Sequence, residues 1–315
     1  MHHAPHIAIV GAGIAGLACA TALQQSGFNV AIFDKSRGPA GRMSTRRGDG
    51  WQCDHGAQYF TARDAGFRAE VARWERAGAA APWYPVVQRF DTAGARLCAP
   101  AERFVGTPRM SAPAALLAST LALRTEVTIS ALQREGAGWR LHAHGAGPLA
   151  HCYDAVVLAL PAPQAAPLLR EVAPVQAALA QSTTMPGCWA LMLQYPAPLA
   201  LGFDAAFVNH GPLRWVARDS AKPGRGGAES WLLHASAAWS ETHIEDDADS
   251  VAAHLLAAFA ALGGPAPQGW SAHRWRHAST APAREEVCIW EAADGLGLCG
   301  DWLNGGTVEA AWLSG

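Results

Sequence analysis

The sequence predicts an α/β fold with a mostly parallel sheet, into which a second domain of α+β type with a mixed sheet is inserted. Three observations support this prediction. A buried strand, a glycine-rich turn, a helix and a second buried strand occupy residues 6–34. An apolar run at 153–160 ends at Pro161 and predicts a strand that returns to the same sheet. From about Cys188 to Arg276, strand patterns predominate instead.

Length and composition set limits on the class of protein. The 315 residues suffice for two domains, or for one large domain with an insertion. Hydrophobic residues make up 50% and charged residues 16% of the chain, which favours a packed core over disorder. The net charge of −2 implies no broad positive field, so neither a nucleic acid nor a membrane is expected as a partner. The seven cysteines are odd in number and widely spaced, as expected for reduced thiols. No apolar run is long enough to span a membrane. We therefore expect a cytoplasmic protein.

The first unit is a strand, a helix and a second strand. Residues 6–10 are rich in β-branched side chains, and residues 14–25 have helical spacing that Gly27 can end. Residues 29–34 form the second buried strand. Two strands joined by a helix within about 30 residues require a parallel, right-handed crossover.

The remaining elements follow along the chain. Residues 35–60 are expected to form a loop, and the predicted helices are 64–77, 112–121 and 247–262. The predicted strands are 126–132, 138–143 (which can pair antiparallel with it), 153–160, 188–195, 213–218, 231–235, 272–276 and 295–301. A last helix begins at Thr307 or Val308. We therefore expect a discontinuous first domain of residues 1–85, 106–164 and 286–315, and a second domain of residues 86–105 and 165–285.

The segment Gly11-Ala-Gly-Ile-Ala-Gly16 is a G-x-G-x-x-G sequence between a strand and a helix, as in Rossmann-type dinucleotide-binding domains. Gly11 permits the tight turn, Gly13 lets the backbone approach a pyrophosphate, and Gly16 lets the helix and strand pack closely. The free N–H groups and the dipole at the start of the helix attract phosphate. Asp34, at the end of the second strand, can accept hydrogen bonds from ribose hydroxyls and disfavours a 2′-phosphate.

The segment after Asp34 distinguishes FAD from NAD. Residues 35–46 resemble the second flavin fingerprint of the flavin amine oxidase superfamily, an R-x-G-G-R-type loop that runs along the pyrophosphate. In this resemblance Arg42 pairs with phosphate oxygens and Arg37 assists, while Ala40 stands in place of the first glycine of the pair.

Other segments carry the same resemblance. Residues 54–60 are similar to the stretch that passes beside the isoalloxazine, and residues 153–161 to the returning strand. Residues 299–301 and the following Gly305, Gly306 and Val308 are similar to the C-terminal flavin motif. There Asp301 would bind the ribityl or pyrophosphate region, and the start of the last helix would face flavin N1 and O2.

The resemblance implies FAD as a non-covalent cofactor. The residues expected to contact it are Gly11, Ala12, Gly13, Ile14, Ala15, Gly16, Asp34, Lys35, Arg37, Gly41, Arg42, Met43, Gln58, Tyr59, Phe60, Val127, Gly300, Asp301 and Val308.

A narrower resemblance covers nearly the whole chain. The segments that carry it run in the order 33–38, 56–63, 105–111, 220–225, 233–236, 239–240, 273–275, 299–302, 308–309 and 311–315. Together they resemble the bacterial renalase group of flavoproteins. This resemblance implies oxidation of dihydronicotinamide dinucleotides that carry the hydride at ring C2 or C6. The flavin takes that hydride at N5, NAD(P)+ leaves, and O2 reoxidises the flavin to give hydrogen peroxide.

Hydride transfer between stacked rings needs positioning more than acid–base groups. The sequence has no Ser-His-Asp order, H-E-x-x-H or paired-carboxylate motif, so no catalytic residue beyond flavin N5 and no metal is expected. Arg109 and Lys222 could contact substrate phosphates, although solvated surface positions are expected for both. The residues expected to contact the substrate are Tyr59, His234, Trp239, Trp275 and Trp302. The alternative for each is a place in the core, as a packed aromatic ring or as a hydrogen-bonded histidine.

Two other functions remain open. A flavin amine oxidase or desaturase acting on a small amine would be favoured by a buried lysine near N5 and a closed aromatic cage. The chain has few lysines, and neither feature can be placed from the sequence. A non-catalytic FAD-bearing or redox-sensing protein is the other alternative. The sequence gives no prediction of the oligomeric state.

Overall fold

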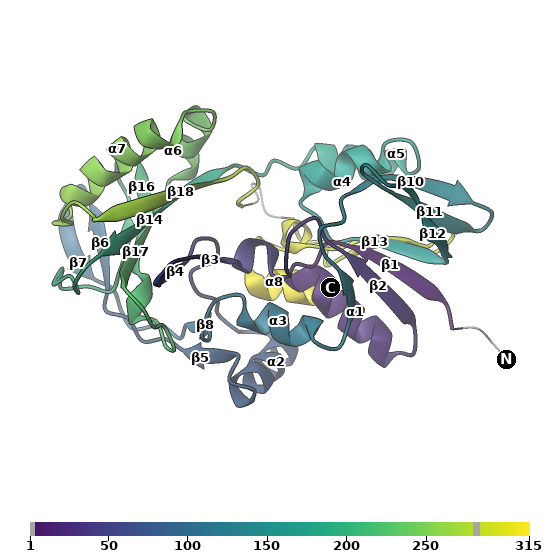
Figure 1. The fold of residues 1–315 in the computed structure, drawn as a ribbon, viewed down its shortest axis with the longest axis horizontal. Coiled ribbons are helices and arrows are strands. Elements are labelled where there is room, and N and C mark those ends of the chain that lie inside the picture. The colour runs from purple at the N-terminus through teal and green to yellow at the C-terminus, as the bar shows by residue number, and fades with distance from the viewer. Residues whose placement is uncertain (1–3, 280–283) are drawn as a thin grey trace.

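The computed structural model describes residues 4–279 and 284–315. Two sheets lie at opposite ends of the long axis of the molecule (Figure 1). The six-stranded sheet at one end is built from both termini and a central segment of the chain. The seven-stranded sheet at the other end comes mostly from residues between Ala205 and Trp275, together with an earlier hairpin and strand 188–195.

The six-stranded sheet is parallel except at one edge. Its order is β19 (Ile289–Glu291), β20 (Leu296–Leu298), β13 (Ala155–Leu158), β1 (His6–Val10), β2 (Asn29–Phe33) and β9 (Ala122–Arg124). Only β19 runs antiparallel to its neighbour. Both predicted strands of the first unit lie side by side at its centre, in register from His6 opposite Asn29 to Val10 opposite Phe33. The predicted parallel sheet is therefore confirmed.

Side chains of β1 alternate between the two faces of this sheet, because successive residues of a strand point in opposite directions. Ile7 and Ile9 pack in the core that includes α1 (Ile14–Gln25), α3 (Ala112–Ala118) and α8 (Val308–Ser314). Ala8 and Val10 pack in the opposite core, with α4 (Ala162–Leu169) and α5 (Pro174–Gln181). Full burial of an isoleucine contributes roughly 1.5–3 kcal/mol, so both layers hold the central strand firmly.

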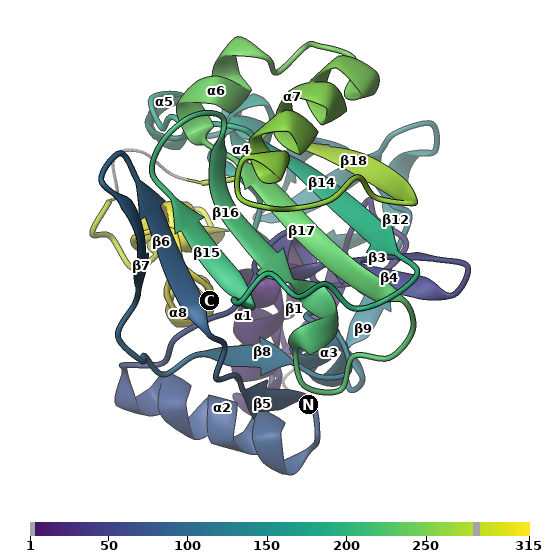
Figure 2. The same ribbon diagram turned by 90° about the vertical axis from the view of Figure 1, so that its left-hand side faces the viewer.

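The seven-stranded sheet is antiparallel apart from one parallel pair, β15–β6. Its order is β18 (Gly269–Trp275), β14 (Cys188–Tyr195), β17 (Glu229–Ala235), β16 (Leu213–Arg218), β15 (Ala205–Val208), β6 (Val87–Asp91) and β7 (Gly94–Leu97). Figure 2 shows α6 (Ala237–Thr242) and α7 (Ala248–Ala260) over one face. Leu191 and Leu233 pack toward α7, whereas Met192 and Leu232 pack on the other face against Cys53. That second face meets the rest of the protein.

Shorter elements complete the fold. They are the hairpin β3 (Thr45–Gly48) and β4 (Trp51–Asp54), the pair β5 (Ala80–Pro82) and β8 (Phe104–Gly106), the sheet β10 (Ile129–Glu135), β11 (Gly138–Ala143) and β12 (Gly147–Tyr153), helix α2 (Ala65–Arg76), and three 3-10 turns at Gly41–Met43, Asp219–Ala221 and Asp301–Leu303. The predicted antiparallel pairing of residues 138–143 is confirmed.

The structure corrects the expectation of a loop over residues 35–60. The β3–β4 hairpin lies within it, closed by the two residues Asp49-Gly50, and Gly50 supplies the positive φ angle of +70° that this turn needs. The predicted domain division stays a prediction. Helix α4 crosses the boundary proposed at residue 165, and both α4 and α5 pack beside the parallel sheet.

Candidate functional site

A cavity of about 2370 Å³ lies between the two sheets. The carboxyl ends of β1 and β2, the loop after β2 and the start of α8 form one part of its wall. Strands β17 and β18 and residues 55–63 form another part. Pockets for one small ligand measure about 300–1,000 Å³, so this cavity has room for a long ligand and a second molecule beside it.

The glycine turn lies at the carboxyl end of β1, against the neighbouring strand. Gly11 has φ +110°, and a Cβ there would lie 2.4 Å from the carbonyl oxygen of Ala159. A Cβ on Gly16 would lie 2.0 Å from the carbonyl oxygen of Gly11, so neither position accepts a side chain. Gly13 begins α1 with no side-chain cap and no acidic residue in the first turn, which leaves the helix N–H groups free for an anion.

Asp34 lies beside this turn and faces the cavity. Its carboxylate accepts hydrogen bonds from the backbone N–H of Ala12 at 2.6 Å and of Ser36 at 2.7 Å. A carboxylate offers about four lone-pair positions, so two hydroxyl donors can still bind. The geometry fits the role expected for this residue at a ribose.

The loop after β2 is joined to the end of β20 by an ion pair. Arg42 donates through both terminal nitrogens to Asp301, with Nη1 3.0 Å from Oδ2. The N–H of Gly300 donates to the Ser314 hydroxyl at 2.8 Å, which fixes this end of β20 against α8. Two predicted flavin motifs, 259 positions apart in the sequence, therefore meet at one point of the cavity.

Ala40 adopts φ +110°, a left-handed conformation that favours glycine. The cost for a residue with a Cβ is about 1–2 kcal/mol. The replacement of the family's glycine therefore strains the loop, and the N–H of Ala40 still donates to the carbonyl of Ala12 at 3.0 Å.

Helix α8 is tied to the chain before α2. The Thr307 hydroxyl accepts from the N–H of Ala310 at 3.0 Å and caps the helix. Glu309 accepts from the backbone N–H groups of Arg63 and Asp64 at 2.6 and 2.7 Å. Val308, at the start of this helix, lines the cavity.

Three imidazoles and an indole form the wall on the side of the seven-stranded sheet, which we call the histidine wall: His55, His234, His273 and Trp275. The carbonyl oxygen of His55 accepts from Trp275 Nε1 at 2.8 Å and lies 3.0 Å from His234 Nε2. The His55 ring stacks on Trp275, with 5.0 Å between centroids, and meets His273 edge-on at 4.7 Å.

The imidazoles of this wall are neutral at pH 7. Burial, reinforced by His273, lowers the pKa of His55 to about 3. Burial also lowers the pKa of His234 and of His273 to about 4, with Lys222 and Arg46 respectively adding positive charge nearby. A neutral imidazole offers one donor and one acceptor, so the wall suits an uncharged polar group.

The low pKa values predict a dependence of stability on pH. Between pH 6.5 and about 4 the unfolded chain protonates His273 and the folded chain does not, so stability falls as the pH falls through this window. His273→Gln removes this contribution. Between pH 7.5 and 4.5 the free energy of unfolding should therefore fall by about 1–3 kcal/mol less in the variant than in wild type. Urea unfolding at both pH values measures this difference. Equal losses in the two proteins would contradict a neutral, half-buried His273.

The charge of the cavity lining is strongly positive. The carboxylates among its described residues are Asp34 and Asp301, one bound to backbone N–H groups and the other paired with Arg42. The cationic side chains are Lys35 and nine arginines, namely Arg37, Arg42, Arg46, Arg47, Arg63, Arg109, Arg214, Arg274 and Arg276. Such a lining attracts anionic ligands and repels cations.

Behind the histidine wall lies a buried charged cluster of Lys222, Asp54, Asp219, Arg225 and Gln58. Lys222 is 2% exposed, and its Nζ lies 2.7 Å from Asp219 Oδ1, 3.1 Å from Asp54 Oδ2 and 3.2 Å from Gln58 Oε1. Arg225 also contacts Asp54 and donates to the carbonyl of Gly106 at 2.9 Å. The predicted solvated position of Lys222 is therefore wrong.

The charges of this cluster hold one another ionised. Burial alone would raise the pKa of Asp54, but Lys222 and Arg225 bring it well below its usual range. Burial and the nearby Asp54 raise the pKa of Asp219 to about 6. Burial would lower the pKa of Lys222, yet Asp219 and Asp54 raise it. The lysine is thus a cation, unsuited to act as a base.

Most predicted cofactor contacts line the cavity, and three do not. Ala12 is buried beneath the turn and offers its N–H to Asp34, and Gly16 packs on Gly11. Gln58 turns away from the cavity, because its amide donates to the carbonyls of Asp54 and Gly56 and accepts from Lys222. The contacts that line it are Gly11, Gly13, Ile14, Ala15, Asp34, Lys35, Arg37, Gly41, Arg42, Met43, Tyr59, Phe60, Val127, Gly300, Asp301 and Val308.

Of the predicted substrate contacts, Tyr59, His234 and Trp275 line the cavity, whereas Trp239 and Trp302 do not. Trp302 is fully buried, and its indole N–H donates to the carbonyl of Leu160 at 3.0 Å. Trp239 stacks on His243, with 4.1 Å between centroids, in α6 on the outer face of the sheet. Both expectations are corrected: Trp302 packs within the core, and Trp239 packs against His243 outside the cavity.

Sequence reasoning missed His55 and His273, although both lie in segments that it quoted. Arg109 does line the cavity, at a half-buried position. Arg46 and Arg47 also line the cavity, and the arginine-rich stretch to which they belong could have indicated an anion-binding role. No motif in the sequence pointed to Arg214 as a cavity residue. A polar residue inside a flavin-like motif is the signal that would have pointed to His55.

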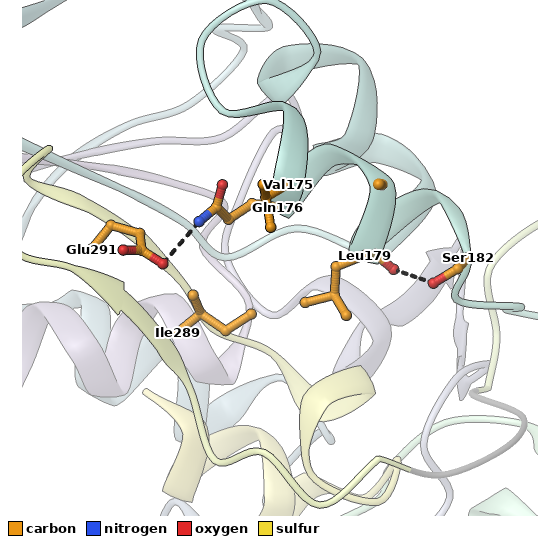
Figure 3. A pocket seen from close by; sticks show the side chains of 7 residues that line it. Val175, Gln176, Leu179, Ser182, Ile289 and Glu291 are labelled. Atoms are coloured by element: carbon orange, nitrogen blue, oxygen red, sulfur yellow. Dashed lines mark hydrogen bonds between the residues drawn. The ribbon is translucent and has the colours of Figure 1, made fainter.

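A second, much smaller hollow of about 440 Å³ lies on the surface between α5 and β19 (Figure 3). Leu179 and Ile289 form its apolar floor, and the Gln176 amide donates to Glu291 at 2.8 Å across one end. The Ser182 hydroxyl donates to the carbonyl of Leu179 at 2.9 Å, and none of the lining residues of this hollow belongs to the larger cavity.

The glycine turn, the carboxylate after β2 and the long positive cavity are the features of a Rossmann-type dinucleotide-binding protein. Residues 9–71 match the family model of an NAD(P)-binding Rossmann-like domain, and residues 63–315 match that of flavin containing amine oxidoreductases. Because the second match covers most of the chain, the protein belongs to the flavin containing amine oxidoreductase family. The predicted superfamily and the flavin cofactor that it implies are therefore confirmed.

Solved structures share this fold at low sequence identity. A provisionally assigned protoporphyrinogen oxidase from Exiguobacterium sp. 255-15 superimposes with a TM-score of 0.81 at 14% identity, over 99% of this chain and 97% of its own. Cyclohexylamine oxidase from Brevibacterium oxydans IH-35A gives 0.76 at 11%, and putrescine oxidase bound to putrescine gives 0.74 at 13%, each over 99% of this chain and 97% of its own. These likenesses establish the fold alone.

One curated relative matches locally. The zeta-carotene-forming phytoene desaturase of Myxococcus xanthus is 46% identical over 50 residues, which is 16% of this chain and only 10% of that protein. No helix in the part of the chain that the structure describes is long and apolar enough to cross a membrane. Within residues 4–279 and 284–315, no group of three histidine, cysteine or acidic side chains is arranged to hold a metal ion.

Proposed function

We propose that the protein is an FAD-dependent oxidase that takes hydride from isomeric (2- or 6-) dihydronicotinamide dinucleotides, giving NAD(P)+ and, with O2, hydrogen peroxide. This is the activity that the renalase-like segments imply. A small-molecule dinucleotide and O2 are its reactants, FAD is held without a covalent bond, and a cytoplasmic location belongs to the same proposal.

The positive lining of the cavity is the observation that carries the proposal. Of the ten cationic side chains that line the cavity, Arg42 is paired with Asp301, and Arg274 and Arg276 are both paired with Glu245. The seven others have no ion pair among the described residues, and the acceptor positions still open on Asp34 are those that suit the ribose of FAD. FAD supplies one pyrophosphate, whereas a dinucleotide substrate supplies a second. A small amine is cationic at pH 7, and it would enter against this field without any carboxylate left to pair with it.

The residues of the site fit FAD. The open space at Gly13 beside the free N–H groups of α1 suits the pyrophosphate, and Asp34 suits the adenosine ribose. Arg42, held by Asp301, belongs to the second flavin motif and would pair with a phosphate of FAD. When bound, FAD would supply the hydride acceptor and the reaction with oxygen. The protein would position the rings and exclude water, with Tyr59, His234 and Trp275 on the substrate side.

The direct test is anaerobic stopped-flow reduction of the purified yellow protein. We expect rapid bleaching by a 2- or 6-dihydronicotinamide dinucleotide, slow bleaching by ordinary NADH, and hydrogen peroxide when air is readmitted. Absence of bleaching by both isomers would contradict the proposal, and absence of bleaching by any reductant would favour a non-catalytic FAD-bearing protein.

A flavin amine oxidase or desaturase remains the alternative, and one observation favours it. The buried lysine expected for such an enzyme is present as Lys222. It lies behind the histidine wall, however, and its ammonium is paired with two carboxylates. Bleaching by a primary or secondary amine, with none by the dihydronicotinamide isomers, would select this alternative.

A further inference from the structure

The carbonyl of His55 determines which nitrogen of His234 carries a hydrogen. A carbonyl oxygen can only accept, so His234 Nε2, at 3.0 Å, must donate to it. The ring is neutral at pH 7 and carries a single hydrogen, because burial lowers its pKa to about 4. Nδ1 of His234 is therefore a lone-pair acceptor.

The orientation of the His234 ring is fixed by its hydrogen bond and by its strand. His234 lines the cavity from β17 and is half-buried, and no residue that the structure describes donates a hydrogen bond to its Nδ1. Strand β17 is paired on both sides, with Ala190 and Trp215 opposite His234. Rotation of the ring would break its bond to the His55 carbonyl, which also holds Trp275. The lone pair thus has a fixed direction.

We infer that His234 recognises the substrate through Nδ1, as a fixed acceptor for an uncharged N–H donor of the primary carboxamide type. This inference rests on the proposed function, in which the oxidised ring carries such a carboxamide. Arg214 and Lys222 place positive charge near His234, so a neutral donor is favoured over an ammonium group. The surrounding arginines would bind the phosphates of the same molecule.

Two dihydro dinucleotides that differ in one group test the inference. In the 3-acetyl analogue a methyl group replaces the NH2 of the carboxamide, so the donor is lost while shape is kept. Wild type should prefer the carboxamide by about tenfold or more in kcat/KM, because a site built for a hydrogen bond discriminates against an analogue that lacks it. Each compound is tested as the isomer that reduces the protein.

Substitutions of His234 then assign the preference to this ring. His234→Gln can keep the bond to the His55 carbonyl but removes Nδ1, and it should lower kcat/KM for the carboxamide while leaving that for the acetyl analogue nearly unchanged. His234→Asn places an amide oxygen near the position of Nδ1 and should keep part of the preference. His210→Gln, at an exposed turn, serves as the matched control and should behave as wild type.

The outcomes separate the two ideas. If wild type and His234→Gln oxidise both compounds with the same preference, the role of His234 is overturned and the proposed function stands. If neither compound reduces wild type, the proposed function fails, and the inference falls with it. FAD content and circular dichroism show whether each variant is folded. If the glutamine variant is not folded, the asparagine variant decides, and loss of all preference in it would contradict the inference.

Discussion

Lys222→Met is expected to lower the free energy of unfolding by about 3–5 kcal/mol, the cost of leaving buried charge without its partner. Lys222 Nζ lies 2.7 Å from Asp219 and 3.1 Å from Asp54, and all three side chains are inaccessible to solvent. Methionine fills a similar volume, so the loss would come from charge and hydrogen bonds. Urea unfolding of the FAD-loaded protein, followed by circular dichroism, measures the change.

Two companion variants show whether the uncompensated charge is the cause. Lys222→Met combined with Asp219→Asn leaves Asp54 paired with Arg225 and should recover a large part of the loss. Arg96→Met removes a cation from an exposed pair with Asp91 at 3.2 Å and should cost at most about 1 kcal/mol, because exposed pairs contribute little. A loss in Lys222→Met as small as that of Arg96→Met would show that the buried cluster does not stabilise the fold.

The same variant bears on the site, because the cluster supports the histidine wall. Asp54 directly precedes His55 and also accepts from the N–H of Met110 at 3.1 Å. Gln58, which bonds Lys222, is one position before Tyr59. A disturbed cluster would therefore shift the wall as well as destabilise the protein.

Local sequence patterns were sufficient for the parallel sheet. Strand, turn, helix and strand follow one another within residues 6–34, and each carries its own signal of spacing, glycine or apolar run. The flavin motifs were found in the same way, because each is a short continuous segment. The strands at 188–195 and 213–218 agree with the structure for a similar reason: the first is apolar except for Gln194, and the second is built around Trp215, Val216 and Ala217.

The histidine wall and the buried cluster could not be derived in this way. His55 meets His234 across 179 positions and Trp275 across 220, and Lys222 meets Asp54 across 168. A lysine in a Pro- and Gly-rich segment has the composition of a surface loop, and only its distant partners make burial favourable. The prediction that Trp302 contacts the substrate was wrong because it relied on a sequence neighbour. Asp301 lines the cavity, whereas the ring of Trp302 packs into the core.

Gly13→Ala is expected to remove FAD while leaving the fold intact, with affinity for the cofactor at least tenfold lower, a change of about 1.4 kcal/mol or more. In the protein alone a Cβ on Gly13 would meet no atom within 4 Å, and its φ of −74° is open to alanine. The pyrophosphate, which the backbone of the turn is expected to approach, would occupy that space. Flavin absorbance of the purified variant and titration of its apoprotein with FAD measure the effect.

Gly16→Ala provides the contrast, because its Cβ would lie 2.0 Å from the carbonyl oxygen of Gly11. That clash is with the protein itself, so this variant should lose both stability and FAD. Gly13→Ala should unfold at the same urea concentration as wild-type apoprotein, which separates a filled ligand site from a damaged turn. If Gly13→Ala binds FAD as tightly as wild type, the pyrophosphate does not lie at the start of α1. The proposed assignment of Tyr59, His234 and Trp275 to the substrate side would then lose its support.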